Sequence, residues 1–457
     1  MFTGGLSMPE QRGKSARYPV VLLVLGALAR FPMMIVLRHI PIFVYIDLSY
    51  TQAGQAILRF NFHALGDRVP VYPLLVALCG LHPHVIWFAQ SILGIAASLM
   101  IFDMAFRRTR HTLFSFLVGI VCSLTPEVLT FESSLMTEAL TNFLLVASIW
   151  LIVRHDGAGE GKLRYPLGLG LIVALLSLTR PLMICLWPVY YCFLVPVWPP
   201  AKILQRAALK RALLFALPAI VFIGGWCGFN YFNSGYFTPT TRAGGNLMDQ
   251  VDPFVDLAPA RFAVLRDTWI ESRRHLGDNV NKSATLVFGS AVTEMAKRTG
   301  KTDIQISREY QSLAVYLQIH HPLLCLRRAE QSWMQFWGEP TLDELEWPQG
   351  SNVTLDEALM TLINFLIREI EAAFLVLALV SAPCSLIFRK AFTRLEYLIF
   401  AIALWVSIFA AFTEFGENRR FCVPFYMLIV YTLLTRGWQW IAATPSAGFG
   451  LSSNQAS

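Results

Sequence analysis

One acidic residue stands directly after the first apolar segment of the chain. Asp47 lies in the run Asp47-Leu48-Ser49-Tyr50, between an apolar stretch and a mixed one. A carboxylate at a lipid interface beside a protein cavity is partly desolvated, and this makes it a stronger base towards a substrate hydroxyl. Asp47 is therefore a candidate general base. An ordinary solvated loop aspartate is the alternative interpretation.

Three arginines lie at the ends of apolar runs that are predicted to face outward, where the positive-inside rule does not favour basic residues. Arg180 ends an apolar run in Leu178-Thr179-Arg180-Pro181, and Arg419 and Arg420 precede the last one. A guanidinium group binds phosphate oxygens as a bidentate fork, so these residues are candidates for holding a phosphate. Local ion pairs to Glu414 or Glu417, or snorkelling to lipid headgroups, are the alternatives.

Three further carboxylates lie on or near one connection between apolar runs: Glu127, Glu132 and Glu138. Acidic groups this close to a bilayer are costly unless they are paired or face water. Glu138 opens a strongly apolar helix, where it either lines a cavity or complements the helix macrodipole. For Glu127 and Glu132 we favour a structural role. His82 and His84 flank a proline and offer at best a weak metal site.

These residues must be positioned by helices in a membrane. The chain has 457 residues, of which 55% are hydrophobic and only 15% are charged. A soluble domain carries about 25% charged residues. The formal charge of +7 does not indicate nucleic-acid binding, because the Lys and Arg residues cluster in short loops, as the positive-inside rule predicts.

Apolar runs of the length that spans a bilayer predict an all-α membrane protein with about ten transmembrane helices. With the N-terminus in the cytoplasm, every densely basic loop is cytoplasmic, and the acidic loop, Arg180 and Arg420 lie outside. A short interfacial helix is expected before residue 85, and helical patterns occur at 260–275 and 307–337. The expected spans lie near residues 18–38, 85–106, 113–129, 135–153, 166–178, 182–198, 212–229, 359–388, 397–412 and 422–440. The predicted parts are an N-terminal membrane module (1–229), a folded hydrophilic segment on the outer face (230–357), C-terminal membrane helices (358–441) and a short polar tail (442–457).

Several motifs together resemble one known group, the GT-C superfamily of polyprenyl-phosphate-sugar-dependent glycosyltransferases. The resemblance is to the bacterial branch related to protein mannosyltransferases and lipid A aminoarabinose transferases, and it covers nearly the whole chain. In the first loop, many relatives have an Asp-Glu pair where Leu48 follows Asp47 here, which leaves a second acidic group unassigned. The motifs are Asp47-x-x-Tyr50, Arg68-Val69-Pro70-Val71-Tyr72-Pro73, Ser133 to Glu138, Leu178 to Pro181, Asn230 to Phe237, Gly244 to Leu247, His321-Pro322 and Arg419-Arg420-Phe421 with Pro424.

The resemblance implies an inverting transfer of a sugar from a polyprenyl-phosphate carrier to an envelope acceptor, which is a glycan, a lipid or a protein. It places the reaction on the extracytoplasmic face of the plasma membrane, with membrane lipid and no nucleic acid as partner. Asp47 is then the catalytic base. The resemblance implies no definite cofactor, and it leaves open whether the reaction needs a divalent metal. The expected substrate-binding residues are Tyr50, Arg68, Tyr72, Glu138, Arg180, Arg419 and Arg420.

Three other classes stay open. A transporter or flippase for a lipid-linked or anionic substrate also needs outer arginines, but it predicts inverted repeats, which the sequence does not show. A polymerase or ligase of the O-antigen type has one large outer loop. A membrane scaffold gives no reason for the outer arginines. The sequence names neither the sugar, the acceptor, the length of the carrier nor the oligomeric state.

Overall fold

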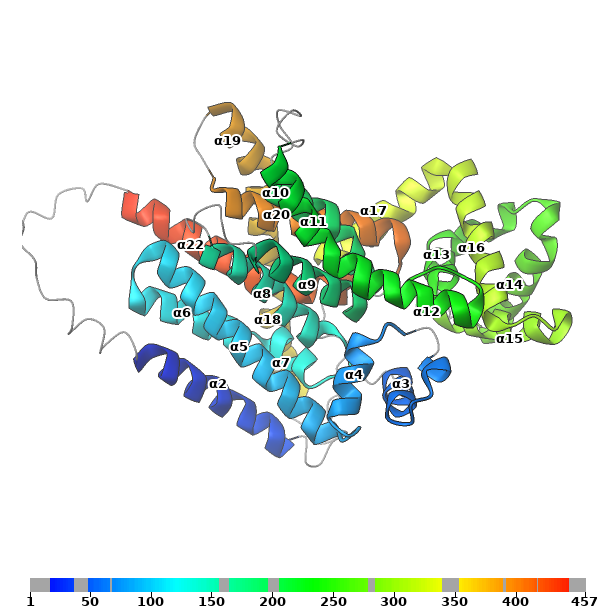
Figure 1. The fold of residues 1–457 in the computed structure, drawn as a ribbon, viewed down its shortest axis with the longest axis horizontal. Coiled ribbons are helices and arrows are strands. Elements are labelled where there is room, and N and C mark those ends of the chain that lie inside the picture. The colour runs from blue at the N-terminus through cyan, green and yellow to red at the C-terminus, as the bar shows by residue number, and fades with distance from the viewer. Residues whose placement is uncertain are drawn as a thin grey trace, which may run out of the picture.

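The fold is made of helices throughout the part of the chain that is described. The computed structural model describes residues 17–36, 48–65, 68–155, 164–195, 205–277, 284–338, 353–388, 392–416 and 418–443. These residues contain no strand, as the predicted all-α class requires. Figure 1 shows an elongated bundle from which one group of helices, α13 to α16, extends at the end of the long axis.

The N-terminal helices lie side by side against one another (Figure 1). The central member is α5, which packs against α2, α6 and α8. Proline at its first position suits a helix start, and Arg107 and Arg108 in its last turn complement the negative end of the macrodipole. The bounds are α2 (Arg17–Val36), α3 (Leu48–Leu58), η1 (Phe62–Leu65), α4 (Val71–Leu78), α5 (Pro83–Thr109), α6 (Thr112–Ser123), α7 (Pro126–Glu132) and α8 (Glu138–His155).

The predicted span at 113–129 is not one straight helix. α6 ends at Ser123 and α7 starts at Pro126, and the two are bent by 51°. Proline cannot donate the backbone hydrogen bond that would continue α6, so the chain turns there. This bend brings α7 and the start of α8 close together, and both carry carboxylates that are important for the site.

The first helices in the middle of the chain are short. α9 has 16 residues and α10 has 9, so neither reaches the ~20 residues of a full span. The next helix runs through Arg206–Ser234 with a π-helical turn directly after Pro218, as expected where proline removes a hydrogen bond. The bounds are α9 (Arg164–Thr179), η2 (Pro181–Cys185), α10 (Leu186–Leu194), α11 (Arg206–Pro218), η4 (Ala219–Ile223) and α12 (Gly224–Ser234).

The hydrophilic segment has a hydrophobic core of its own. Met248, Trp269, Tyr310 and Leu317 are among its buried residues, and the Trp269 indole donates to Asp252 Oδ1 at 2.6 Å. The expected helix at 307–337 breaks at the His321–Pro322 step, because proline restricts the residue before it. The bounds are α13 (Ala243–Val251), η5 (Asp252–Leu257), η6 (Ala260–Phe262), α14 (Ala263–Leu276), α15 (Ala284–Thr299), α16 (Asp303–His320) and α17 (Pro322–Gly338).

The C-terminal helices return to the bundle. α20 packs against α10 and α17, and α22 packs against α5, α6 and α18. One large core joins these helices to the N-terminal ones. The bounds are α18 (Val353–Val376), η8 (Leu377–Ser381), α19 (Ala382–Phe388), α20 (Arg394–Thr413), α21 (Asn418–Cys422), η9 (Val423–Phe425) and α22 (Tyr426–Ala443).

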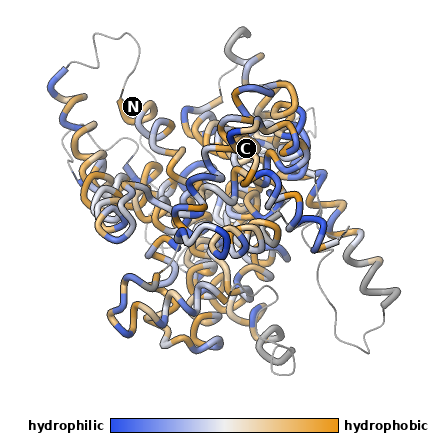
Figure 2. Tube along the Cα trace, turned by 90° about the vertical axis from the view of Figure 1, so that its right-hand side faces the viewer, coloured by the Kyte–Doolittle hydropathy of each residue, from blue (hydrophilic) through white to orange (hydrophobic). Residues whose placement is uncertain are grey.

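The chain is a membrane protein by the length and apolarity of its helices. Within the described ranges, 5 helices are long and apolar enough to cross a bilayer, or 6 if the bent pair α6–α7 counts as one span. Figure 2 shows hydrophobic residues along most of the helices, with hydrophilic stretches between them. The count of about ten spans stays a prediction.

Candidate functional site

The start of α8, the end of α9 and the short helix α21 meet at one point. Glu138 is the first residue of α8, Arg180 follows α9, and Arg420 lies in α21. The Arg180 guanidinium is 3.2 Å from Glu138 Oε1, and Arg420 Nε is 3.8 Å from the same oxygen. We call Glu138, Arg180 and Arg420 the Glu138 cluster.

The local sequence explains why these side chains face one another. Glu138 is stabilised at the positive end of the α8 macrodipole. Arg180 has extended backbone angles (φ −146°, ψ 115°) because the following Pro181 disfavours helix at that position. The chain therefore leaves α9 at Arg180 and presents the guanidinium to the start of α8.

The carboxylate in this cluster is buried and has unused bonding capacity. Glu138 is 1% exposed, and among the described residues no donor forms a hydrogen bond to either of its carboxylate oxygens. Arg180 Nη1 likewise has no hydrogen-bond acceptor there. Buried polar atoms in native proteins are nearly always hydrogen-bonded, so a ligand is one explanation for these atoms.

Aromatic and sulfur atoms hold the two arginines. The Arg180 guanidinium carbon lies 3.9 Å from the centre of the Phe421 ring, and that of Arg420 lies 5.5 Å from it. Arg420 Nη1 is 3.3 Å from Met136 Sδ. Stacking fixes a guanidinium group without using its hydrogen-bond donors. The three residues of the Glu138 cluster are two cations and one carboxylate, with a formal charge of +1, and Glu414 also interacts electrostatically with Arg180.

The first loop meets this cluster. Arg68 donates to Ser49 Oγ at 2.7 Å and to the Tyr50 hydroxyl at 3.2 Å, and it lies 4.4 Å from the centre of the Tyr50 ring. The rings of Tyr50 and Tyr72 make an edge contact at 4.8 Å. Arg180 interacts electrostatically with Tyr50. The structure thus brings six of the predicted site residues together: Tyr50, Arg68, Tyr72, Glu138, Arg180 and Arg420.

Tyr72 is anchored to the α7–α8 connection. Its hydroxyl lies 2.9 Å from Gln90 Oε1, and the Gln90 amide donates to the backbone carbonyls of Glu132 and Ser134 at 2.8 and 2.9 Å. Asp47, the predicted base, lies outside the described residues. It directly precedes Leu48, where α3 begins, and Tyr50 of the same helix is in the site.

Arg419 lies elsewhere, although it is the neighbour of Arg420. Its Nη1 donates to both carboxylate oxygens of Glu371 at 2.7 Å, and its Nη2 donates to Glu127 Oε1 at 2.6 Å. We call Glu127, Arg419 and Glu371 the Arg419 clamp. Arg419 is 6% exposed and bound by two carboxylates, so its guanidinium is held more tightly than those of the Glu138 cluster.

Glu132 is paired as well. Arg30 of α2 donates to its two carboxylate oxygens at 2.6 Å each. The structural interpretation favoured for Glu127 and Glu132 therefore agrees with the ion pairs seen. Arg30 and Glu371 were missed from the sequence, although each is a charge inside an apolar run, and such charges are unusual enough to be a signal.

The described residues do not form a metal centre by themselves. No group of three His, Cys, Asp or Glu side chains with the geometry for a metal ion occurs among them. His82 and His84 are exposed at the start of α5. The first loop lacks a second acidic group, and the carboxylate that interacts electrostatically with Tyr72 is Glu138.

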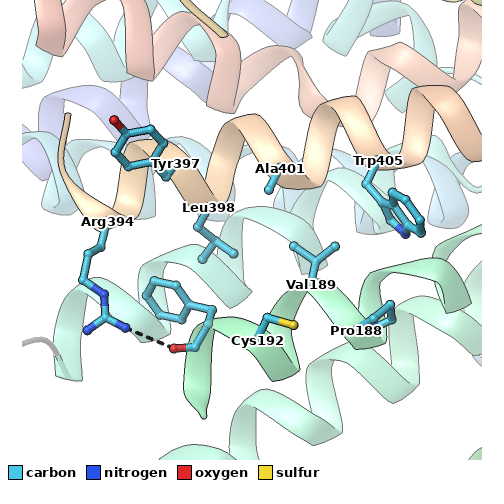
Figure 3. A pocket seen from close by; sticks show the side chains of 9 residues that line it. Pro188, Val189, Cys192, Arg394, Tyr397, Leu398, Ala401 and Trp405 are labelled. Atoms are coloured by element: carbon cyan, nitrogen blue, oxygen red, sulfur yellow. Dashed lines mark hydrogen bonds between the residues drawn. The ribbon is translucent and has the colours of Figure 1, made fainter. Parts of the chain in front are cut away.

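A separate groove lies between α10 and α20 (Figure 3). Its volume is about 500 Å³, and its walls are mostly apolar, with Val189, Leu398 and Trp405 among them. Arg394 at one end donates to the Phe193 carbonyl at 3.3 Å. The lining contains no carboxylate and none of the predicted site residues.

Comparison with known proteins gives matches among solved structures only. No protein-family model matches the chain, and no curated protein sequence does. The apo crystal structure of an oligosaccharyltransferase from Archaeoglobus fulgidus is similar with a TM-score of 0.48 at 13% identity, over 93% of this chain and 51% of that one.

A second match is to the oligosaccharyltransferase AglB from the same organism, in complex with an inhibitory peptide and a dolichol-phosphate. Its TM-score is 0.42 at 13% identity, over 96% of this chain and 53% of that one. The chain thus spans about half the length of the solved structures that it matches. At this identity and these TM-scores, the likeness says nothing about activity, donor or acceptor.

Proposed function

We propose that the chain is an inverting glycosyltransferase that moves a sugar from a polyprenyl-phosphate carrier to an envelope acceptor. The observation that carries this proposal is the Glu138 cluster, because two guanidinium groups converge there and Arg180 Nη1 has no hydrogen-bond acceptor among the described residues, so it can donate to a phosphate oxygen. The motif resemblance to the GT-C superfamily supplies the reaction class. The Glu138 cluster acts on the phosphate, so whether the sugar is a hexose or a pentose depends on other contacts.

The reaction needs a base, an acceptor hydroxyl and a leaving group in line. Asp47 takes the proton of the acceptor hydroxyl while that oxygen forms a bond to the anomeric carbon. The bond from this carbon to the phosphate oxygen breaks at the same time, and its electron pair leaves with the polyprenyl phosphate. Attack from the face opposite the leaving group inverts the anomeric configuration.

Arg180 and Arg420 stabilise the charge that develops on the departing phosphate. The phosphodiester of the donor already carries one negative charge, and the departing phosphate gains a second, so the two arginines stabilise the transition state more than the bound donor. Glu138 holds the two guanidinium groups near one another against their mutual repulsion. Arg68 and Tyr50 bind the donor beside them, since a tyrosine ring and hydroxyl together suit a sugar. Tyr72 is fully buried and supports Tyr50 through the contact between their rings.

The position of the cluster supports a reaction at the membrane face opposite the basic loops. Glu138 and Arg154 stand at opposite ends of α8, whose 18 residues extend over about 27 Å. Arg154 and Arg107 meet at Asp103, at the end away from Glu138. By the positive-inside rule that end faces the cytoplasm, so the proposed site is extracytoplasmic. The resemblance to the GT-C superfamily implies the plasma membrane.

The test is release of polyprenyl phosphate by the purified protein in lipid nanodiscs. A panel of polyprenyl-phosphate sugars is incubated with and without envelope acceptors, and the released lipid phosphate is measured. We expect release from at least one donor, and its loss in Asp47→Asn with unchanged folding. No release from any donor, together with measurable movement of a lipid-linked sugar across vesicles, would establish a transporter instead.

A further inference from the structure

Arg419 and Arg420 occupy adjacent positions in α21, which forms the first turn of a continuous helical run, Asn418–Ala442. The contacts that Arg419 makes with neighbouring elements fix the rotation of this first turn. They thereby set the direction in which Arg420 points.

The Arg419 clamp provides such contacts from three elements. Glu127 belongs to α7, Glu371 to α18, and the Phe336 carbonyl of α17 lies 3.5 Å from Arg419 Nη1. The exposed fractions are 0% for Glu127 and 1% for Glu371. Since buried, hydrogen-bonded ion pairs have defined geometry, the clamp fixes Arg419 from opposite sides.

A second tether fixes the connection just before α21. The backbone carbonyl of Glu414 accepts hydrogen bonds from Ser332 at 2.8 Å and from Asn418 at 2.8 Å, and also from the Gln250 side chain. Gln250 also donates to the Ala411 carbonyl at 2.8 Å. Helices α13 and α17 of the hydrophilic segment thus hold the last turn of α20 and the start of α21.

We propose that Glu127 and Glu371 are positioning residues, which act on the reaction by holding Arg419 and thereby orienting Arg420 toward Glu138. This inference rests on the proposed function. Adjacent residues of one helical turn point about 100° apart, so a clamp on Arg419 determines the direction of Arg420. If the clamp loosens, the distance from Arg420 to Glu138 increases and the phosphate is held less well.

The test compares Glu371→Gln with Glu396→Gln in the full-length protein in nanodiscs. Glu396 is a matched control, because it is 1% exposed and 2.8 Å from Arg108, away from α21. We expect Glu371→Gln to lower kcat for sugar transfer by a factor on the order of 100, as a small misplacement of a charge-stabilising group does, while Glu396→Gln lowers it less than threefold. Equal losses in both variants would overturn the proposal.

A double-mutant cycle distinguishes positioning from a general loss of stability. In an Arg420→Ala background, Glu371→Gln should reduce transfer no further, because the group that it positions is already absent. The same factor of loss in both backgrounds would contradict the role through Arg420. Glu127→Gln gives a second, independent arm of the cycle if Glu371→Gln does not fold.

Hydrogen exchange gives a readout that does not need activity. The amides of residues 414–425 should exchange at least tenfold faster in Glu371→Gln than in the native protein and in Glu396→Gln. Unchanged exchange there would overturn the clamp itself. Faster exchange in a protein that transfers no sugar from any donor would refute the proposed function and retain the clamp.

Discussion

Two charge clusters lie side by side on α21 and differ in composition and bonding. The Arg419 clamp has one arginine between two carboxylates, so its formal charge is −1, and every pair in it is within 2.7 Å. The Glu138 cluster has two arginines around one carboxylate, a formal charge of +1, and contacts of 3.2 and 3.8 Å.

The difference indicates what each cluster does. Buried ion pairs with short hydrogen bonds, such as those of Arg419, stabilise a structure, because removal of one partner leaves an unpaired buried charge. In the Glu138 cluster the ion pairs are longer, and Arg180 Nη1 has no hydrogen-bond acceptor among the described residues, so it can donate to a ligand that arrives from outside. On this account the clamp is built for position and the Glu138 cluster for phosphate, although the arginines in them are neighbours in the sequence.

The largest effect should follow the loss of the central arginine of the clamp. Arg419→Met removes the cation from between Glu127 and Glu371 and leaves two carboxylates facing one another. We expect a loss of about 3–5 kcal/mol in the free energy of unfolding. Thermal unfolding in detergent measures this, and a midpoint equal to that of the native protein would show that the clamp does not support the fold.

Arg180→Gln and Arg420→Gln should affect the reaction and leave folding intact. Each removes one charge from the Glu138 cluster, and we expect the transfer rate to fall by a factor of about 100–1000 per residue. Initial rates with saturating donor give the factor. A fall in the unfolding midpoint as large as that in Arg419→Met would erase the distinction between the clusters.

Glu138→Gln should separate binding from catalysis. It raises the formal charge of the cluster from +1 to +2, so we expect inorganic phosphate to inhibit the variant more strongly than the native protein. The guanidinium groups lose their common anchor, so kcat should fall roughly tenfold. Inhibition constants for phosphate at fixed ionic strength measure the first effect, and weaker inhibition would show that the cluster is not an anion site.

Salt should have the smallest effect. The Arg420 side chain is 26% exposed, against 7% for Arg419, so dissolved ions screen the Glu138 cluster more than the clamp. Between about 0.05 and 0.3 M NaCl, we expect KM for the donor to rise roughly threefold and the unfolding midpoint to stay constant. If the unfolding midpoint falls over the same salt range in which donor binding weakens, the two clusters are not electrostatically separate.

Part of this arrangement could be predicted from the sequence. The all-α class follows from apolar runs, and the expected short helix before residue 85 is α4, with α5 starting at Pro83. Glu138, Arg180 and Arg420 could be singled out because the positive-inside rule does not explain charged residues at the outer ends of apolar helices. Pro126 is a visible signal for the bend that divides the run at 113–129.

The rest depends on packing that no local pattern encodes. Arg419 and Arg420 were grouped because they are adjacent, but neighbours on a helix point in directions about 100° apart and meet different partners. The partner of Arg419, Glu371, is 48 residues away in the sequence. Arg30 and Glu132 are separated by 102 residues. Such pairings are set by helix packing, which one sequence does not reveal.

Direct binding of polyprenyl phosphate tests the central claim, that the Glu138 cluster holds the phosphate of a lipid carrier. Titration of the native protein in nanodiscs should give saturable binding, and the double variant Arg180→Gln/Arg420→Gln should bind at least tenfold more weakly with an unchanged unfolding midpoint. Glu396→Gln should bind as the native protein does. Equal affinity in the double variant and the native protein would contradict the account.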